Sequence, residues 1–244
     1  MSHYAVGVIV PTENMLDEQY LEQLIDDYNE NMEVDEYEKT CSCVISMDHK
    51  KAREIVEAEI GSIEERRAAF EEREDVKARV KEAKEKDIPE FIMLQDLWTE
   101  HIQVPFERKY NEVLESMPKE EQAKPDPECE DCHGTGIVKS RYNPLSKWDW
   151  YTIGGRWEQN GDLGENTLSV TSHLKEIEDP DKAFFAYVEP DPDMDPEERW
   201  HEKAEMHMFG CTSKNKYKKE WQSEVKELLG KYKDHVIVIV DCHI

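Results

Sequence analysis

The sequence lacks the long apolar runs that mark membrane proteins, and it lacks an export signal. No stretch of its 244 residues approaches the ~20 consecutive apolar residues that a membrane-spanning helix needs. The N-terminus, Met1-Ser2-His3-Tyr4, has no basic segment followed by an apolar one, so we expect no signal peptide. These absences predict a cytoplasmic protein that has no membrane partner.

Positive charge is also scarce. Lysine and arginine total 31 against 57 aspartates and glutamates, which gives a formal net charge of -26. Such acidity opposes binding to nucleic acid, which is itself strongly anionic. An acidic surface could instead imitate DNA, but interleaved lysine and arginine break up the field that a mimic requires. We therefore expect no direct nucleic-acid binding, and we expect the acidity to serve solubility or a protein contact.

The common catalytic signatures are missing. The sequence contains no phosphate-binding Walker loop, no G-x-S-x-G and no H-E-x-x-H. General acid–base chemistry would still be possible where aspartate and histidine converge, and strands often deliver such groups at their ends. The candidates are Asp149, His201, Asp241 and His243. The alternative is that each is an ordinary surface or hydrogen-bonded residue, so the sequence leaves open whether the protein is an enzyme.

Short apolar runs predict a sheet that contains both ends of the chain. Residues 4–10 and 235–240 are almost continuously apolar, as in strands buried on both faces, and 183–188 form a third run. Apolar residues at helical spacing predict amphipathic helices over 17–28 and 217–229. Together they predict an α+β or α/β fold with a single sheet-containing body.

The middle of the chain changes character. Its apolar residues form only a narrow stripe, and opposite charges recur four residues apart, which is typical of an exposed helix. Pro89 interrupts this helix, and a second helical stretch follows that bends near Pro105. We interpret residues 50–119 as a charged helical hairpin inserted into a body formed by residues 1–49 and 120–244. A helical layer lying flat on the body is the alternative.

The six cysteines fall as a C-x-C pair, a C-x-x-C pair and two single residues. Close thiol pairs in a protein without an export signal favour metal over disulfides. Zinc prefers four ligands, and the hairpin would bring both pairs together as a closed structural site in the body. The expected zinc ligands are Cys41, Cys43, Cys129 and Cys132. Cys211, His133 and His243 are substitutes, and buried thiols in a tight turn are the alternative. We expect residues 37–47 to be a strand or a loop leading into one.

A dense aromatic block follows the second thiol pair. Tryptophan faces stack on nucleobases, the guanidinium fork of Arg156 matches phosphate, and adjacent glycines let a ligand approach the backbone. The block therefore predicts a site for an anionic, nucleotide-like small molecule. Its expected residues are Lys147, Trp148, Trp150, Tyr151, Gly154, Gly155, Arg156 and Trp157. An irregular aromatic core, with Arg156 paired to Asp149, is the alternative.

These motifs resemble those of a family of small proteins encoded mostly by bacteriophages and prophages. The resemblance rests on the CxxCxGTG knuckle at 129–136, the tryptophan block at 143–157 and the closing Asp-Cys-His-Ile at 241–244. It covers the expected body well and the charged arm poorly, and the acidic, proline-rich stretch near 190–211 departs from the family pattern. The resemblance implies a bacteriophage source and action in the host bacterial cytoplasm, but no particular reaction.

Three functions are compatible with these features. The leading hypothesis is a phage accessory protein with an anti-defence role, which binds and sequesters a nucleotide-derived small molecule. The second is a hydrolase that cleaves such a nucleotide in the same site. The third is an acidic, protein-binding inhibitor of a host factor. Turnover of a nucleotide separates the first two functions, and deletion of the arm tests the third.

Overall fold

The computed structural model describes residues 2–15, 17–117, 123–159, 171–174, 177, 179–207 and 210–244 of the chain. Contacts within it define two compact units, Met1–Asp35 with Arg141–Ile244, and Glu36–Ser140. We call the first the sheet unit and the second the helical unit. The boundaries lie outside the expected limits of 50 and 119, so both cysteine pairs are grouped with the helices.

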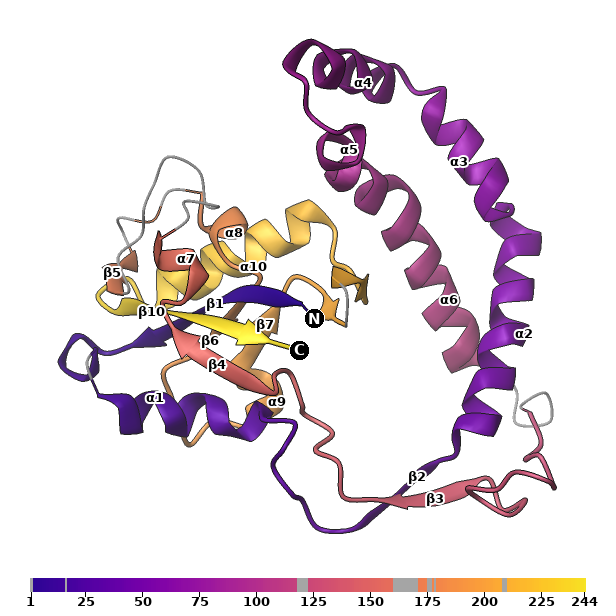
Figure 1. Cartoon of the computed structure of the whole chain (residues 1–244), viewed down its shortest axis with the longest axis horizontal. Coiled ribbons are helices and arrows are strands. Elements are labelled where there is room, and N and C mark those ends of the chain that lie inside the picture. The colour runs from indigo at the N-terminus through magenta and orange to yellow at the C-terminus, as the bar shows by residue number, and fades with distance from the viewer. Residues whose placement is uncertain are drawn as a thin grey trace. The chain divides into compact units, whose positions relative to one another are not determined.

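The sheet unit is built on a mixed sheet of six strands in the order β4-β10-β1-β6-β7, with β5 also pairing with β10. The strands are β1 (His3–Val10), β4 (Trp150–Ile153), β5 (Thr171–His173), β6 (Ala186–Val188), β7 (Trp200–Glu202) and β10 (Val236–His243). The antiparallel pairing of β1 and β10 runs from His3 opposite His243 to Val10 opposite Val236. The two terminal strands therefore lie side by side within the sheet, which confirms the prediction from their apolar runs (Figure 1).

Alternate residues of a strand point to opposite faces of the sheet, so the apolar strands present apolar side chains on both faces. A helix covers each face. On one face, Val6 and Val8 of β1 share a buried cluster with residues of α1 (Glu18–Ile25). On the other, Ile9 of β1 and Ile239 of β10 join a cluster with α10 (Lys218–Lys231) (Figure 1).

Smaller elements of the unit are η1 (Thr12–Asn14), η2 (Asp26–Tyr28), α7 (Arg156–Gln159), α8 (Pro180–Ala183), α9 (Pro196–Arg199), β8 (Glu205–Met206) and β9 (Thr212–Ser213).

The helical unit begins as a two-stranded ladder and continues as a helical hairpin. Its elements are β2 (Tyr37–Thr40), α2 (Ser42–Ile60), α3 (Ile63–Glu71), α4 (Glu74–Lys86), α5 (Glu90–Trp98), the π-helix η3 (Thr99–Gln103), α6 (Val104–Ser116) and β3 (Ile137–Ser140). The expectation of strand or loop across 37–47 was wrong in its second half, because pairing with β3 stops at Thr40 and the chain turns into α2. With the mixed sheet, this hairpin gives the predicted α+β fold.

Local sequence explains where the hairpin bends. Gly61 ends α2 with φ +88, and Ser62 starts α3 with a reciprocal capping box to Glu65. The π-helix precedes Pro105, whose missing N–H and bulky ring disrupt regular α-helical bonding. The helices then return so that α6 packs beside α2 (Figure 1).

In the part of the chain that the structure describes, no helix is both long enough and apolar enough to cross a membrane.

Candidate metal centre and histidine–aspartate cluster

The β2–β3 ladder places the first thiol pair at the start of α2. The amide of Cys41 donates to the carbonyl of Gly136 at 2.8 Å, just beyond the last ladder pair. Cys41 is the N-cap of α2, and Cys43 lies in the first helical turn. Both sulfurs therefore sit at the positive end of a helix, where a thiolate is stabilised.

The second thiol pair lies in a tight turn that depends on its glycines. The amide of His133 donates to the carbonyl of Cys129 at 2.9 Å, and the amide of Thr135 donates to that of Cys132 at 3.0 Å. The chain then passes through Gly136 with φ +76, where a Cβ atom would lie 2.6 Å from Cγ of Pro125. The glycines of the CxxCxGTG motif are thus needed to fold the turn, which explains their presence beside the thiols.

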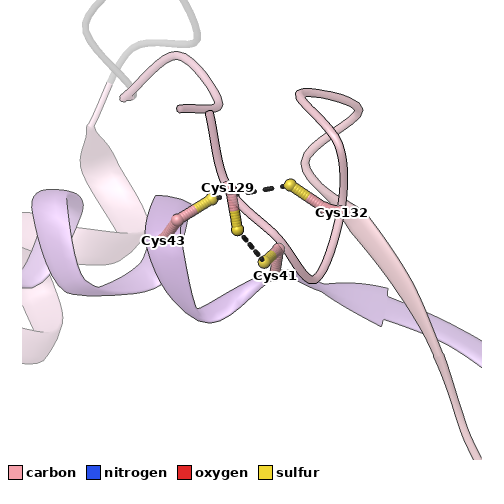
Figure 2. A group of neighbouring side chains, drawn as sticks. All are labelled: Cys41, Cys43, Cys129 and Cys132. Atoms are coloured by element: carbon pink, nitrogen blue, oxygen red, sulfur yellow. Dashed lines mark hydrogen bonds between the residues drawn. The ribbon is translucent and has the colours of Figure 1, made fainter. Parts of the chain in front are cut away.

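The four sulfurs converge with the spacing of a metal site. Cys41 Sγ lies 3.7 Å from Cys129 Sγ, and Cys43 Sγ lies 3.7 Å from Cys132 Sγ (Figure 2). All four sulfurs lie within 4.8 Å of one another. A disulfide would need about 2.05 Å, whereas tetrahedral coordination with a metal–sulfur distance of about 2.3 Å places sulfurs about 3.8 Å apart. The four cysteines could therefore hold a metal ion.

The electrostatics of the group also favour a cation. Burial opposes ionisation of Cys132, but the amide of Gly136 and the neighbouring thiols lower its pKa to about 7. At Cys43 the amide of Asp126 favours the thiolate, yet burial and the three other thiols raise the pKa to about 12. One negative charge forms readily and further charges are resisted, so a cation is what would allow all four thiols to ionise.

The expected substitute ligands do not join this group. Among the described residues, the four clustered cysteines form the group that could hold an ion. Cys211 is an exposed free thiol, and the His243 ring contacts the rings of His3 and Trp150 in the sheet unit.

The aromatic block is divided between the two faces of the sheet. Trp148 is only 4% exposed, packs in the α1-side cluster and donates from Nε1 to the carbonyl of Ile25 at 3.2 Å. Tyr151 packs against the same cluster, and Lys147 Nζ pairs with Glu202 Oε1 at 2.8 Å. These three expected ligand-binding residues therefore make internal contacts that position the block.

The other face gathers the polar side chains of the block around Asp241, which is 3% exposed. Its carboxylate accepts from Nε1 of Trp157 at 3.1 Å and from the amide of Arg156 at 3.2 Å. Nε of Arg156 lies 3.4 Å away, and Nδ1 of His3 lies at 3.0 Å. Arg156 thus pairs with Asp241 and not with Asp149. Because these donors surround the carboxylate of Asp241, the side chains that supply them are held in fixed positions around it.

Gly155 makes this arrangement possible. It has φ +55, and a Cβ atom would lie 2.5 Å from Cβ of Asp241. Gly154 also has a positive φ of 75, and its amide donates to the carbonyl of Ile239 at 2.8 Å. The glycine pair therefore lets the chain pass directly over the aspartate, and it serves the fold of this face.

Two histidine–aspartate pairs lie next to each other on this face. His243 Nδ1 lies 2.5 Å from Asp149 Oδ1, while His3 Nδ1 faces Asp241. The imidazole centroids are 4.8 Å apart, and the ring of Trp150 stacks on His243 at 5.0 Å while remaining 45% exposed. Among the described residues, neither Nε2 atom has a hydrogen-bond partner. Each imidazole is thus oriented through Nδ1, and its Nε2 has no protein partner among the described residues, with the His3 side chain 13% exposed and that of His243 6% exposed.

His201 lies elsewhere, on β7, separated from β1 by β6. Its Nε2 lies 2.9 Å from Glu189 Oε1 and its Nδ1 lies 3.0 Å from Glu224 Oε1. Burial lowers its pKa, but the two carboxylates outweigh this and raise it above its usual value. With both nitrogens engaged, the geometry gives His201 a role in joining β6 and β7 to α10.

Sequence reasoning missed two groups. The sequence marks His3 only as the start of a strand, and its partner Asp241 lies 238 residues away, so only the β1–β10 register reveals the pair. Arg199 is fully buried, pairs with Asp27 and donates to the hydroxyl of Tyr28. Nothing in the acidic stretch around Arg199 distinguishes it from an exposed arginine.

Comparison with protein-family models, with curated proteins and with solved structures finds no match to this chain.

Proposed function

We propose that the sheet unit is a hydrolase whose paired imidazoles, His3 and His243, cleave a nucleotide-derived small molecule. The observation that carries the proposal is their arrangement: two rings 4.8 Å apart, each held through Nδ1 by a carboxylate. A neutral imidazole accepts a proton from water at Nε2, and a protonated one donates a proton to a leaving oxygen. Asp149 and Asp241 orient the rings.

Two neighbouring groups favour a nucleotide as the substrate class. Trp150 offers an exposed ring face beside His243 for stacking on a base. The Arg156 side chain, 47% exposed, presents a guanidinium next to the histidines for a phosphate. Under the phage resemblance, the substrate would be a host signalling nucleotide and its removal would counter defence.

Sequestration without cleavage is the second candidate. The same exposed ring and guanidinium favour it, because they would bind a nucleotide even if the histidines transferred no proton. Binding and turnover must therefore be measured on the same samples.

The test uses the full chain with a panel of nucleoside phosphates and cyclic nucleotides, followed by chromatography and mass spectrometry. We expect turnover of at least one member, a loss of at least 100-fold in His3→Asn and in His243→Asn, and no change in His235→Asn. His235 precedes β10 at its opposite end, so it is a matched control. Binding without turnover would select sequestration, and neither binding nor turnover would refute both proposals.

We also infer that the ion held by the four cysteines is zinc with a structural role. Four thiolates select zinc or iron–sulfur chemistry, and zinc suits a closed tetrahedral set. Elemental analysis of protein purified without added metal should find one zinc per chain. Iron in place of zinc, or no metal, would contradict this inference.

A further inference from the structure

Two guanidinium groups of the helical unit converge on one aromatic ring. The Cζ atom of Arg66, on α3, lies 4.5 Å from the centroid of Phe106 on α6. The Cζ atom of Arg53, on α2, lies 5.8 Å from the same centroid. Both guanidiniums therefore lie within reach of the same ring, and the charge of Arg53 acts on Arg66. A ring attracts a cation, but it supplies no negative charge to offset two of them.

Other arginines of this unit have carboxylate partners. Arg67 pairs with Glu71 at 3.0 Å, Arg73 with Asp75 at 2.8 Å and Arg79 with Asp96 at 2.8 Å. Among the described residues, neither Arg53 nor Arg66 forms an ion pair. In a chain with a net charge of -26, two cations that share one aromatic ring and have no carboxylate partner are unexpected.

The contacts of Arg66 are incomplete. Its Nη1 donates to the carbonyl of Ile102 in the π-helix at 3.3 Å, while its buried Nε has no acceptor among the described residues. Burial lowers its pKa, the charge of Glu57 acts against this without forming an ion pair, and the charge of Arg53 adds to the lowering. The groups around Arg66 therefore do not fully offset its positive charge.

We propose that Arg53 and Arg66 form an oxyanion site on α2 and α3 that takes a phosphate group. Phosphate at neutral pH carries about 1.5 to 2 negative charges, enough to offset both guanidiniums, whereas a carboxylate offsets one. The planar forks suit its oxygens, and the Phe106 ring holds the forks in place. The nearby carboxylate of Glu57 reduces the affinity, so the site suits a phosphate borne by a larger molecule. This site is independent of the histidine cluster.

The test titrates the full chain with inorganic phosphate at constant ionic strength and follows the arginine Nε–Hε signals by NMR. We expect saturable shifts of the Arg53 and Arg66 signals and none for Arg67, which lies on the same helix as Arg66 but is paired. Arg53→Gln should weaken phosphate binding at least tenfold. Arg66→Gln should do the same, and Arg67→Gln should leave binding unchanged.

Two controls keep the outcome interpretable. Arg53 is exposed, so Arg53→Gln should retain the helical circular dichroism of the wild type even if Arg66→Gln perturbs packing. Titration with acetate distinguishes a phosphate site from a carboxylate site. The proposal is overturned by the absence of saturable shifts, by unchanged affinity in Arg53→Gln, or by acetate binding as tightly as phosphate.

Discussion

The two units of this protein are stabilised in different ways. In the sheet unit, β1 and β10 are buried along nearly their whole length between clusters that include α1 and α10. The helical unit has a small buried cluster around Phe70, Val76 and Ile102, together with exposed ion pairs such as Arg67–Glu71. Exposed pairs of this kind contribute about 0–1 kcal/mol each. Under the proposal that the four thiols hold a structural metal, the base of the helical unit should depend on them far more than any part of the sheet unit depends on a single group.

The difference shows how one acidic chain accommodates its charge. The sheet unit buries few charges and surrounds each with partners, as at Asp241 and Arg199. The helical unit leaves most of its charges in water, as at Arg67 and Glu71, where desolvation is slight and screening is strong. Arg66, with its buried Nε, is an exception. Acid–base chemistry, which requires a fixed geometry, should follow the same division, because buried and fully hydrogen-bonded polar groups hold their positions and exposed ones do not.

Removing the metal that we propose for the four thiols should give the largest effect and should distinguish the two units. We expect chelation, or Cys132→Ser, to unfold the knuckle and the β2–β3 ladder while the sheet unit stays folded. Structural zinc in small sites contributes about 10–16 kcal/mol of apparent binding energy, which is then lost to folding. Hydrogen exchange resolved by peptide would measure this. Cys211→Ser, which removes an exposed thiol, should have no effect. Equal loss of protection in both units would show that the comparison is wrong.

A buried and an exposed arginine give the next largest contrast. Arg199→Ala should destabilise the sheet unit by about 3 kcal/mol, the lower end for breaking a buried ion pair, since its partner Asp27 remains 39% exposed and partly hydrated. Arg67→Ala should change stability by no more than about 0.5 kcal/mol, because both side chains of that pair are more than half exposed. Urea denaturation of each variant measures both. Similar costs at the two sites would remove the distinction that we draw.

Much of the fold was predictable from the sequence, because its main signals, apolar runs and prolines, each lie within a short segment. The apolar runs at both termini predicted the central strands, and Pro89 and Pro105 predicted where the hairpin would change direction. The four thiols were predictable because the spacing of each pair constrains its geometry, and the structure brings the pairs together. The strand expected through Cys43 was not found, since helix formation there depends on packing that the run itself does not encode.

The histidine cluster was only half predictable. Asp241 and His243 were identified from their place at the end of a predicted strand, and Asp149 as a residue that could converge with them. Which face each occupies depends on strand register, because neighbouring residues alternate in direction. Register places Trp148 in the α1-side core and Trp150 opposite His243. It also brings His3 to Asp241 from the other end of the chain. No local pattern carries that information.

Gly155→Ala tests whether the backbone that passes over Asp241 can accommodate a side chain. Because φ is positive and the added Cβ atom would lie 2.5 Å from Cβ of Asp241, the substitution should lower the unfolding free energy by about 1–3 kcal/mol. The substitution should also displace the carboxylate and reduce any nucleotide turnover. Gly230→Ala is the matched control, since nothing lies within 4 Å of its added Cβ and it lies within α10. It should be neutral or stabilise by up to about 1 kcal/mol. Denaturant midpoints compare the two, and equal stability of both variants would contradict the assignment.

The smallest effect should be a pH dependence of the sheet unit that arises at His201. Its pKa is raised in the folded protein, since Glu224 and Glu189 outweigh the opposing effect of burial. The resulting stability is fully present below the unfolded pKa of about 6.5 and is lost as pH rises through the folded pKa. The loss amounts to about 1.4 kcal/mol for each pH unit that separates these two pKa values. The pKa values of Glu189 and Glu224 are lowered although burial opposes this, mainly by Lys231 and by His201 respectively. The stability that these two carboxylates contribute is present above about pH 4.5 and is lost as pH falls through their folded pKa values.

His201→Gln should therefore flatten the alkaline decline in unfolding free energy, whereas His235→Gln should leave it in place. Because the helical unit has no comparable buried histidine network among its described residues, the decline should appear in hydrogen exchange of β6, β7 and α10 alone. An equal decline across α2 and α6 would mean that the two units do not differ in this respect.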